Sequence, residues 1–211
     1  MSLQQTDTLV KPDMQAVLSR THLTKNIHGF LLPILEAISN GMHGIEARFD
    51  DQSSAKGKIL IHFKNFSKPS ELEVIVTDNG TGLDDENYTS FKTPFSGYKL
   101  KRNGRGFGRF IAFKVYSTIT YASRYTFFEK EIDRNFKFDI YAEEEIVFLN
   151  KPHRLNDCGV SVKFRSALLD WHETINETNE ETLADEIGSH FLPQFLYGWL
   201  PEIQIQFDNN K

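Results

Sequence analysis

Two short groups of residues combine chemically capable side chains with a defined spacing. In LEAISNGMHGIEA, Glu36 and Asn40 are four residues apart, so a helix places both side chains on one face. A carboxylate there can act as a general base toward water, and an amide oxygen can take one position around Mg²⁺. In VTDNGTGL, Asp78 ends an alternating strand-like run and is followed by Gly80 and Gly82. Such a carboxylate can accept a hydrogen bond from an exocyclic amino group, while glycines let a flat ring approach the backbone.

A third group, KLKRNGRGFGRF, has the character of an anion-binding loop. Gly104, Gly106 and Gly108 alternate at the start of the apolar, helix-like run 107–115. Glycines free backbone N–H groups to face an anion, and a helix N-terminus favours phosphate. The segment 92–109 holds six basic residues and no acidic one. It lacks the G-K-[ST] ending of a P-loop, so a Gly-rich surface loop remains an alternative, as a solvated helix face and an Asn-Gly turn do for the other groups.

The composition is that of an ordinary globular protein, and it bounds the function. The chain has 211 residues, 39% of them hydrophobic and 18 of them Phe, enough for one well-buried, aromatic-rich domain. Its formal charge of -5 argues against bulk nucleic-acid binding, which remains conceivable only for a longer protein. The single cysteine, Cys158, cannot form an intramolecular disulfide. With no apolar span or signal peptide in the sequence, we expect a cytoplasmic protein without a membrane partner.

The elements that must position these groups alternate between helical and strand patterns. We expect an N-terminal arm at 1–25 and one domain at 26–211, the first module of a longer protein. Apolar residues three and four apart predict a long helix over 27–49, interrupted or kinked at Pro33. Further helices are predicted at 14–20 and 180–197, and strands at 58–64, 71–77, 118–122, 125–132, 135–141, 160–164 and 202–207. Five apolar residues near the C-terminus are expected in the core: Phe191, Leu192, Phe195, Leu196 and Trp199.

The order and spacing of the three groups resemble the GHKL ATPase superfamily, which includes the DNA gyrase B subunits, heat-shock chaperones, histidine kinases and MutL proteins. The resemblance covers roughly 27–207. It implies an α+β fold, a two-layer α/β sandwich with a mixed, mostly antiparallel sheet, known as the Bergerat ATP-binding fold. ATP would lie between the helices and the sheet under a mobile lid at 84–103.

The resemblance also implies roles for particular residues. Glu36 would be the general base and Asn40 the Mg²⁺ ligand. Asp78 would bind the adenine amino group. The residues expected at the nucleotide are Asn40, Asp78, Gly80, Gly82, Leu83, Lys101, Gly104, Arg105, Gly106, Phe107 and Gly108.

Three features depart from the family pattern. Many relatives carry an Asp-Ala pair where this chain has His43-Gly44, and we expect His43 to face solvent. A Gly-Thr in relatives corresponds to Gly159-Val160, and Ser161 cannot replace that Thr because alternate strand residues face opposite sides. Gyrase-like members also take a γ-phosphate lysine from a following domain.

The leading hypothesis is slow, Mg²⁺-dependent ATP hydrolysis, with lid closure driving homodimerisation or coupling to a downstream domain. An alternative is an ATP-gated interaction module with little or no hydrolysis. A histidine-kinase catalytic domain fits less well, since no dimerisation hairpin with a phospho-accepting His precedes the domain. A plain α+β domain for another anionic ligand remains if the resemblance misleads.

Overall fold

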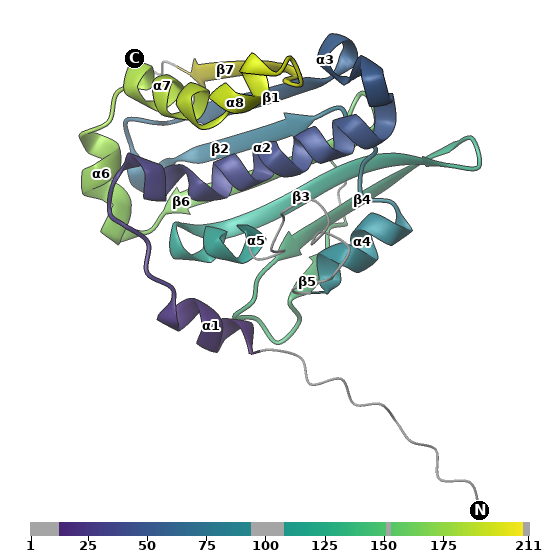
Figure 1. Cartoon of the computed structure of the whole chain (residues 1–211). Coiled ribbons are helices and arrows are strands. Elements are labelled where there is room, and N and C mark those ends of the chain that lie inside the picture. The colour runs from purple at the N-terminus through teal and green to yellow at the C-terminus, as the bar shows by residue number, and fades with distance from the viewer. Residues whose placement is uncertain (1–12, 94–107, 151–152, 209–211) are drawn as a thin grey trace, which may run out of the picture.

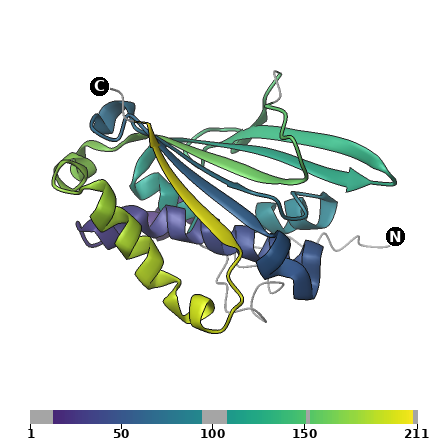
Figure 2. The ribbon, with the colours of Figure 1, turned by 90° about the horizontal axis from the view of Figure 1, so that it is seen from above.

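The molecule is a seven-stranded sheet with helices packed against one face. A computed structural model describes residues 13–93, 108–150 and 153–208. The strand order is β5-β4-β3-β6-β2-β1-β7, with β1 and β7 parallel and all other neighbours antiparallel. Figure 1 shows α2 lying along the sheet, and Figure 2 shows the helices gathered on one side of it. The predicted α+β sandwich with a mixed, mostly antiparallel sheet is thus confirmed.

The strands are β1 (Lys58–Lys64), β2 (Glu73–Asp78), β3 (Tyr116–Phe127), β4 (Lys130–Phe138), β5 (Ile146–Phe148), β6 (Gly159–Ala167) and β7 (Glu202–Asp208). The helices are α1 (Met14–Arg20), α2 (Ile27–Phe49), α3 (Ser53–Lys56), α4 (Asp85–Lys92), α5 (Gly108–Ile111), α6 (His172–Asn176), α7 (Glu180–His190) and α8 (Leu192–Leu196).

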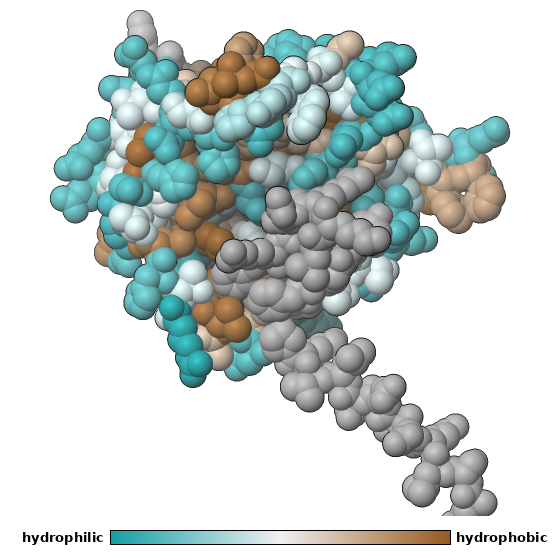
Figure 3. Space-filling view, viewed as in Figure 1, coloured by the Kyte–Doolittle hydropathy of each residue, from teal (hydrophilic) through white to brown (hydrophobic). Residues whose placement is uncertain are grey.

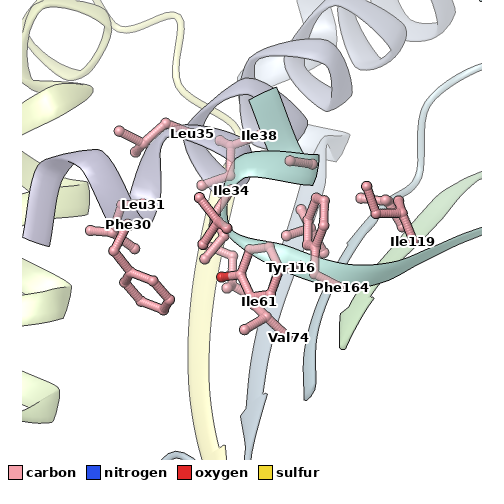
Figure 4. Close-up of a cluster of buried hydrophobic side chains, with 14 of the residues drawn as sticks. Phe30, Leu31, Ile34, Leu35, Ile38, Ile61, Val74, Tyr116, Ile119 and Phe164 are labelled. Carbon is pink, nitrogen blue, oxygen red and sulfur yellow. The ribbon is translucent and has the colours of Figure 1, made fainter. Parts of the chain in front are cut away.

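Helix α2 has the predicted bounds and runs through Pro33 without interruption. Asn26 caps its start by accepting a hydrogen bond from the Gly29 backbone N–H at 2.9 Å. Its apolar stripe faces the sheet, as Figure 4 shows for residues of α2 opposite Ile61 of β1 and Val74 of β2. Because this stripe is buried, the opposite edge of α2 is fixed relative to the ends of the strands.

The predicted helix at 14–20 is also confirmed, and it packs onto the domain although it lies within the expected arm. Leu18 is fully buried, and Gln15 Nε2 donates a hydrogen bond of 2.7 Å to the Ile140 carbonyl. The start of β2 differs slightly from the prediction, because Pro69–Glu71 forms a 3₁₀ turn before the strand.

The predicted strand boundaries between 118 and 141 are wrong. One strand, β3, continues through Ser123 and Arg124, whose polarity had suggested a break. Both are satisfied in place: Ser123 Oγ accepts the Leu83 N–H at 2.7 Å, and Arg124 pairs with Asp133 at 2.8 Å. The turn that follows places Phe128 and Glu129 at positive φ, without the Gly or Asn that would have marked it. Strand β5 is too short to leave a pattern.

The helix predicted over 180–197 is wrong as a single element. It divides at Phe191, and Pro193 then starts the short α8, since a proline fits the first turn of a helix better than its interior. Of the apolar residues expected in the core here, Phe191 is buried, whereas Phe195, Leu196 and Trp199 are 65%, 71% and 72% exposed and Leu192 is 49% exposed. Figure 3 shows apolar surface at the top of the molecule, where α8 lies.

Candidate functional site

Asp78 stands at the end of β2 and faces a cavity between α2 and the sheet. Its Oδ1 accepts hydrogen bonds from the backbone N–H groups of Gly80 at 2.8 Å and Val160 at 3.3 Å. Oδ2 accepts none from the residues that the structure describes, so this oxygen is oriented but not consumed by the fold. Burial raises the pKa of Asp78 from its usual 3.8 to about 6, although the two backbone hydrogen bonds and Arg48 act to lower it.

The glycines around Asp78 allow close backbone packing. A Cβ at Gly41 of α2 would lie 3.0 Å from Asp78 Cβ, and one at Gly80 would lie 2.6 Å from the Gly44 carbonyl carbon. The Thr81 N–H donates to the Gly44 carbonyl at 3.2 Å, which ties the loop to the helix. Gly82 has φ of 80° and lies against the Arg124 carbonyl of β3. Both predicted glycines are therefore needed for the loop to pass between α2 and β3.

We expect Gly80→Ala to lower the free energy of unfolding by about 1–3 kcal/mol, because its Cβ would push the loop away from α2. Gly188→Ala in α7 is the matched control, since a Cβ there meets nothing within 4 Å and should stabilise the helix by about 0.5–1 kcal/mol. Urea unfolding of both variants measures the difference. Equal stability of the two variants would contradict the packing described for Gly80.

Leu83 connects the Asp78 loop to the next helix. Its side chain lines the cavity, and its carbonyl accepts a hydrogen bond from Arg134, whose Nη2 also pairs with Asp85 at 2.7 Å. Asp84 caps α4 by accepting the Asn87 N–H at 2.7 Å. The first part of the predicted lid, 84–103, is thus a helix held at its N-terminus, and 94–103 lies outside the described residues.

Glu36 and Asn40 lie at the other end of the cavity and contact each other. Asn40 Nδ2 donates to Glu36 Oε1 at 3.2 Å, and both side chains line the cavity. Gly108, at the start of α5, packs against them, because a Cβ there would overlap Glu36 Cγ and Cδ. The structure therefore brings together Glu36, Asn40 and Gly108, as the sequence predicted.

The remaining residues predicted in the glycine-rich loop cannot be placed. Lys101, Gly104, Arg105, Gly106 and Phe107 lie outside the described residues.

Arg109 is a cavity residue to which the sequence analysis gave no role. It follows Gly108 on α5, lines the cavity, and lies over the rings of Phe91 and Phe110 at 5.1 and 4.3 Å. Burial lowers its pKa from 12.5 to about 10, against the nearby Tyr121, Glu36 and Glu145, so it stays charged at neutral pH. Its position directly after the last glycine of the loop was the available signal.

The departures from the family pattern are also visible. His43 lines the cavity, which corrects the expectation that it turns to solvent, because the α2 face carrying Asn40 also carries it. Val160 lines the cavity, whereas the Ser161 hydroxyl lies 2.8 Å from the Thr77 hydroxyl on the opposite face of the sheet. Ser161 therefore does not face the cavity, as the strand alternation predicted.

The cavity pairs apolar walls with a few polar groups. Its apolar lining includes Val76, Val162 and Phe164, and its polar groups cluster at the Asp78 and Glu36 ends. Helix α2 rises about 8 Å between Glu36 and Gly41, which touches Asp78, so the two carboxylates are well separated. An apolar slot with separated polar ends is typical of a site for an elongated polar ligand with a flat apolar part.

No protein-family model matches this chain, and no curated protein is significantly similar to it in sequence. Within 13–93, 108–150 and 153–208, no helix is long and apolar enough to cross a membrane. The same residues contain no group of three or more His, Cys, Asp and Glu side chains arranged to hold a metal ion.

Proposed function

We propose that this chain is a GHKL-type domain with a Bergerat fold that binds ATP and hydrolyses it slowly with Mg²⁺. The observation that carries the proposal is the Asp78 carboxylate, held at a strand end by two backbone N–H groups with Oδ2 turned to the cavity. The fold spends the cost of burying this charge without pairing it to a cation, which favours a ligand that donates a hydrogen bond. The adenine amino group is such a donor.

The opposite end of the cavity suits the phosphates. Glu36 is placed to accept a proton from the attacking water, and Gly108 allows the start of α5 to approach it closely. Asn40 would hold Mg²⁺, whose role is to neutralise charge on the phosphate oxygens. A single protein ligand is enough because Mg²⁺ commonly completes its shell with phosphates and water. The absence of a larger acidic cluster among the described residues is compatible with this assignment.

The proposal extends to partners and compartment. We propose that closure of the 84–103 segment over ATP alters association with a second copy of the chain or with a downstream domain, as the family resemblance implies. The chain would work in the reducing cytoplasm, where its single Cys158 needs no partner thiol.

The test compares ATP with GTP at several pH values. GTP carries an oxygen where adenine carries its amino group, so it should bind at least about 100-fold more weakly because it would face the Asp78 oxygen. Protonation of Asp78 places a hydrogen on the accepting oxygen, so affinity for ATP and adenosine should fall about tenfold from pH 8 to pH 5, with the decline starting near pH 6. Adenosine is included because it has no phosphate to titrate. Equal binding of ATP and GTP would refute the assignment of Asp78.

A further inference from the structure

Arg109 occupies the phosphate end of the proposed nucleotide cavity. It is adjacent to Gly108, whose backbone packs on the Glu36 carboxylate, and Glu36 is one of the groups that act electrostatically on it. Among the described residues that line the cavity, Arg109 is the permanently charged cation. It lies at the far end from Asp78, since Asp78 contacts Gly41 and Gly80 instead.

Aromatic packing fixes the direction of this guanidinium. Phe110 comes from the same helix, and Phe91 comes from α4 at the start of the proposed lid. Phe91 is itself held edge-on against Tyr121, Phe136 and Phe138 at 5.0 to 5.3 Å. Ring contacts use the face of a guanidinium, whereas its N–H donors lie in its plane and match the oxygens of a phosphate.

The charges around Arg109 leave room for an anion. Glu36 and Glu145 favour its charged form, and Tyr121 is neutral because burial raises its pKa. Burial still outweighs them, since the pKa of Arg109 remains below its usual value. A ligand that brings negative charge to this end of the cavity would stabilise the cation further.

We propose that Arg109 contacts the terminal phosphate and makes the site selective for nucleoside triphosphates over diphosphates. This inference rests on the proposed ATP-binding function, because Asp78 must hold the base for the phosphates to reach Arg109. Glu36 has to stand beside the terminal phosphate to activate water, and Arg109 adjoins Glu36, so the terminal phosphate is the group within its reach. Loss of that phosphate would remove the contact.

The experiment measures affinities for a non-hydrolysable ATP analogue and for ADP in wild type and Arg109→Met, where Met preserves an apolar stem among the aromatic rings. Analogue affinity should fall at least about 30-fold, since a charge-assisted phosphate contact is lost, while ADP affinity should change less than about threefold. Arg109→Lys keeps the charge but loses the planar donors, so we expect an intermediate loss. Arg134→Met is the matched control, because Arg134 also lies over an aromatic ring, Tyr88 at 4.3 Å, but is not among the described cavity residues. It should leave the ratio of the two affinities unchanged.

The outcomes separate this inference from the function beneath it. Wild type that binds neither nucleotide, while unfolding cooperatively, would overturn the proposed function. Wild type that binds both, combined with equal losses for both in Arg109→Met, would leave the function standing and refute phosphate selection by Arg109. Thermal unfolding of each variant distinguishes these results from misfolding.

Discussion

Asp78→Asn is expected to weaken ATP binding at least about 100-fold. The variant keeps an oxygen to accept the Gly80 and Val160 N–H groups, so the loop should retain its conformation. It replaces the cavity-facing Oδ2 by an amide NH₂, which would oppose the adenine amino group with a second donor. The loss of a charge-assisted hydrogen bond and the new mismatch act in the same direction. Calorimetric titration with an ATP analogue measures the change.

The same substitution should not destabilise the fold at pH 7.5. The pKa of Asp78 is about two units higher in the folded protein than its usual 3.8, so the folded state binds more protons and stability declines as pH rises from about 4 to 6. Asn does not titrate, so the variant should gain up to about 3 kcal/mol relative to wild type above pH 6, less the screening by solvent in the cavity. Asp170→Asn, at a side chain that is 78% exposed outside the cavity, should change neither property. A variant that binds ATP like wild type would contradict the role of Asp78.

Glu36→Gln is expected to reduce ATP turnover about 10²- to 10⁴-fold, the usual range for loss of a general base. The amide has the volume of the carboxylate and keeps an oxygen for the Asn40 Nδ2 hydrogen bond of 3.2 Å, so the geometry beside Gly108 should persist. It cannot take a proton from water. ATP affinity should therefore change by less than about threefold while kcat falls, which steady-state phosphate release and titration measure together.

Glu46→Gln provides the matched control for that variant. Glu46 is exposed on the same helix and is not among the described cavity residues, so its turnover should equal that of wild type. Full turnover in Glu36→Gln would remove Glu36 from the mechanism. Absence of turnover in wild type that still binds ATP would favour the alternative, an ATP-gated interaction module with little hydrolysis.

Long periodic elements could be predicted from the sequence because burial and pattern agree in them. The stripe from Phe30 to Ile45 gives α2 its bounds, and the β-branched alternation before Asp78 gives β2. The pairing of Glu36 with Asn40 followed from helical spacing alone. These local rules also located the Asp78 end of the candidate site.

The failures have tertiary causes. Ser123 and Arg124 look like a strand break until their partners Leu83 and Asp133 are known, and those partners are distant in sequence or across a hairpin. The exposure of Trp199 could not be anticipated, because an apolar residue reads as core wherever its neighbours are unknown. Arg109 was counted as one of several basic residues because only the fold shows that it turns into the cavity rather than toward solvent.

The most direct measurement is calorimetric titration of the purified chain with a non-hydrolysable ATP analogue, with and without Mg²⁺. We predict saturable binding at one site per chain, strengthened by Mg²⁺ and accompanied by a rise in Tm. Absence of both heat and thermal stabilisation, in a sample that unfolds cooperatively, would contradict the proposal that the cavity between Asp78 and Glu36 is a nucleotide site.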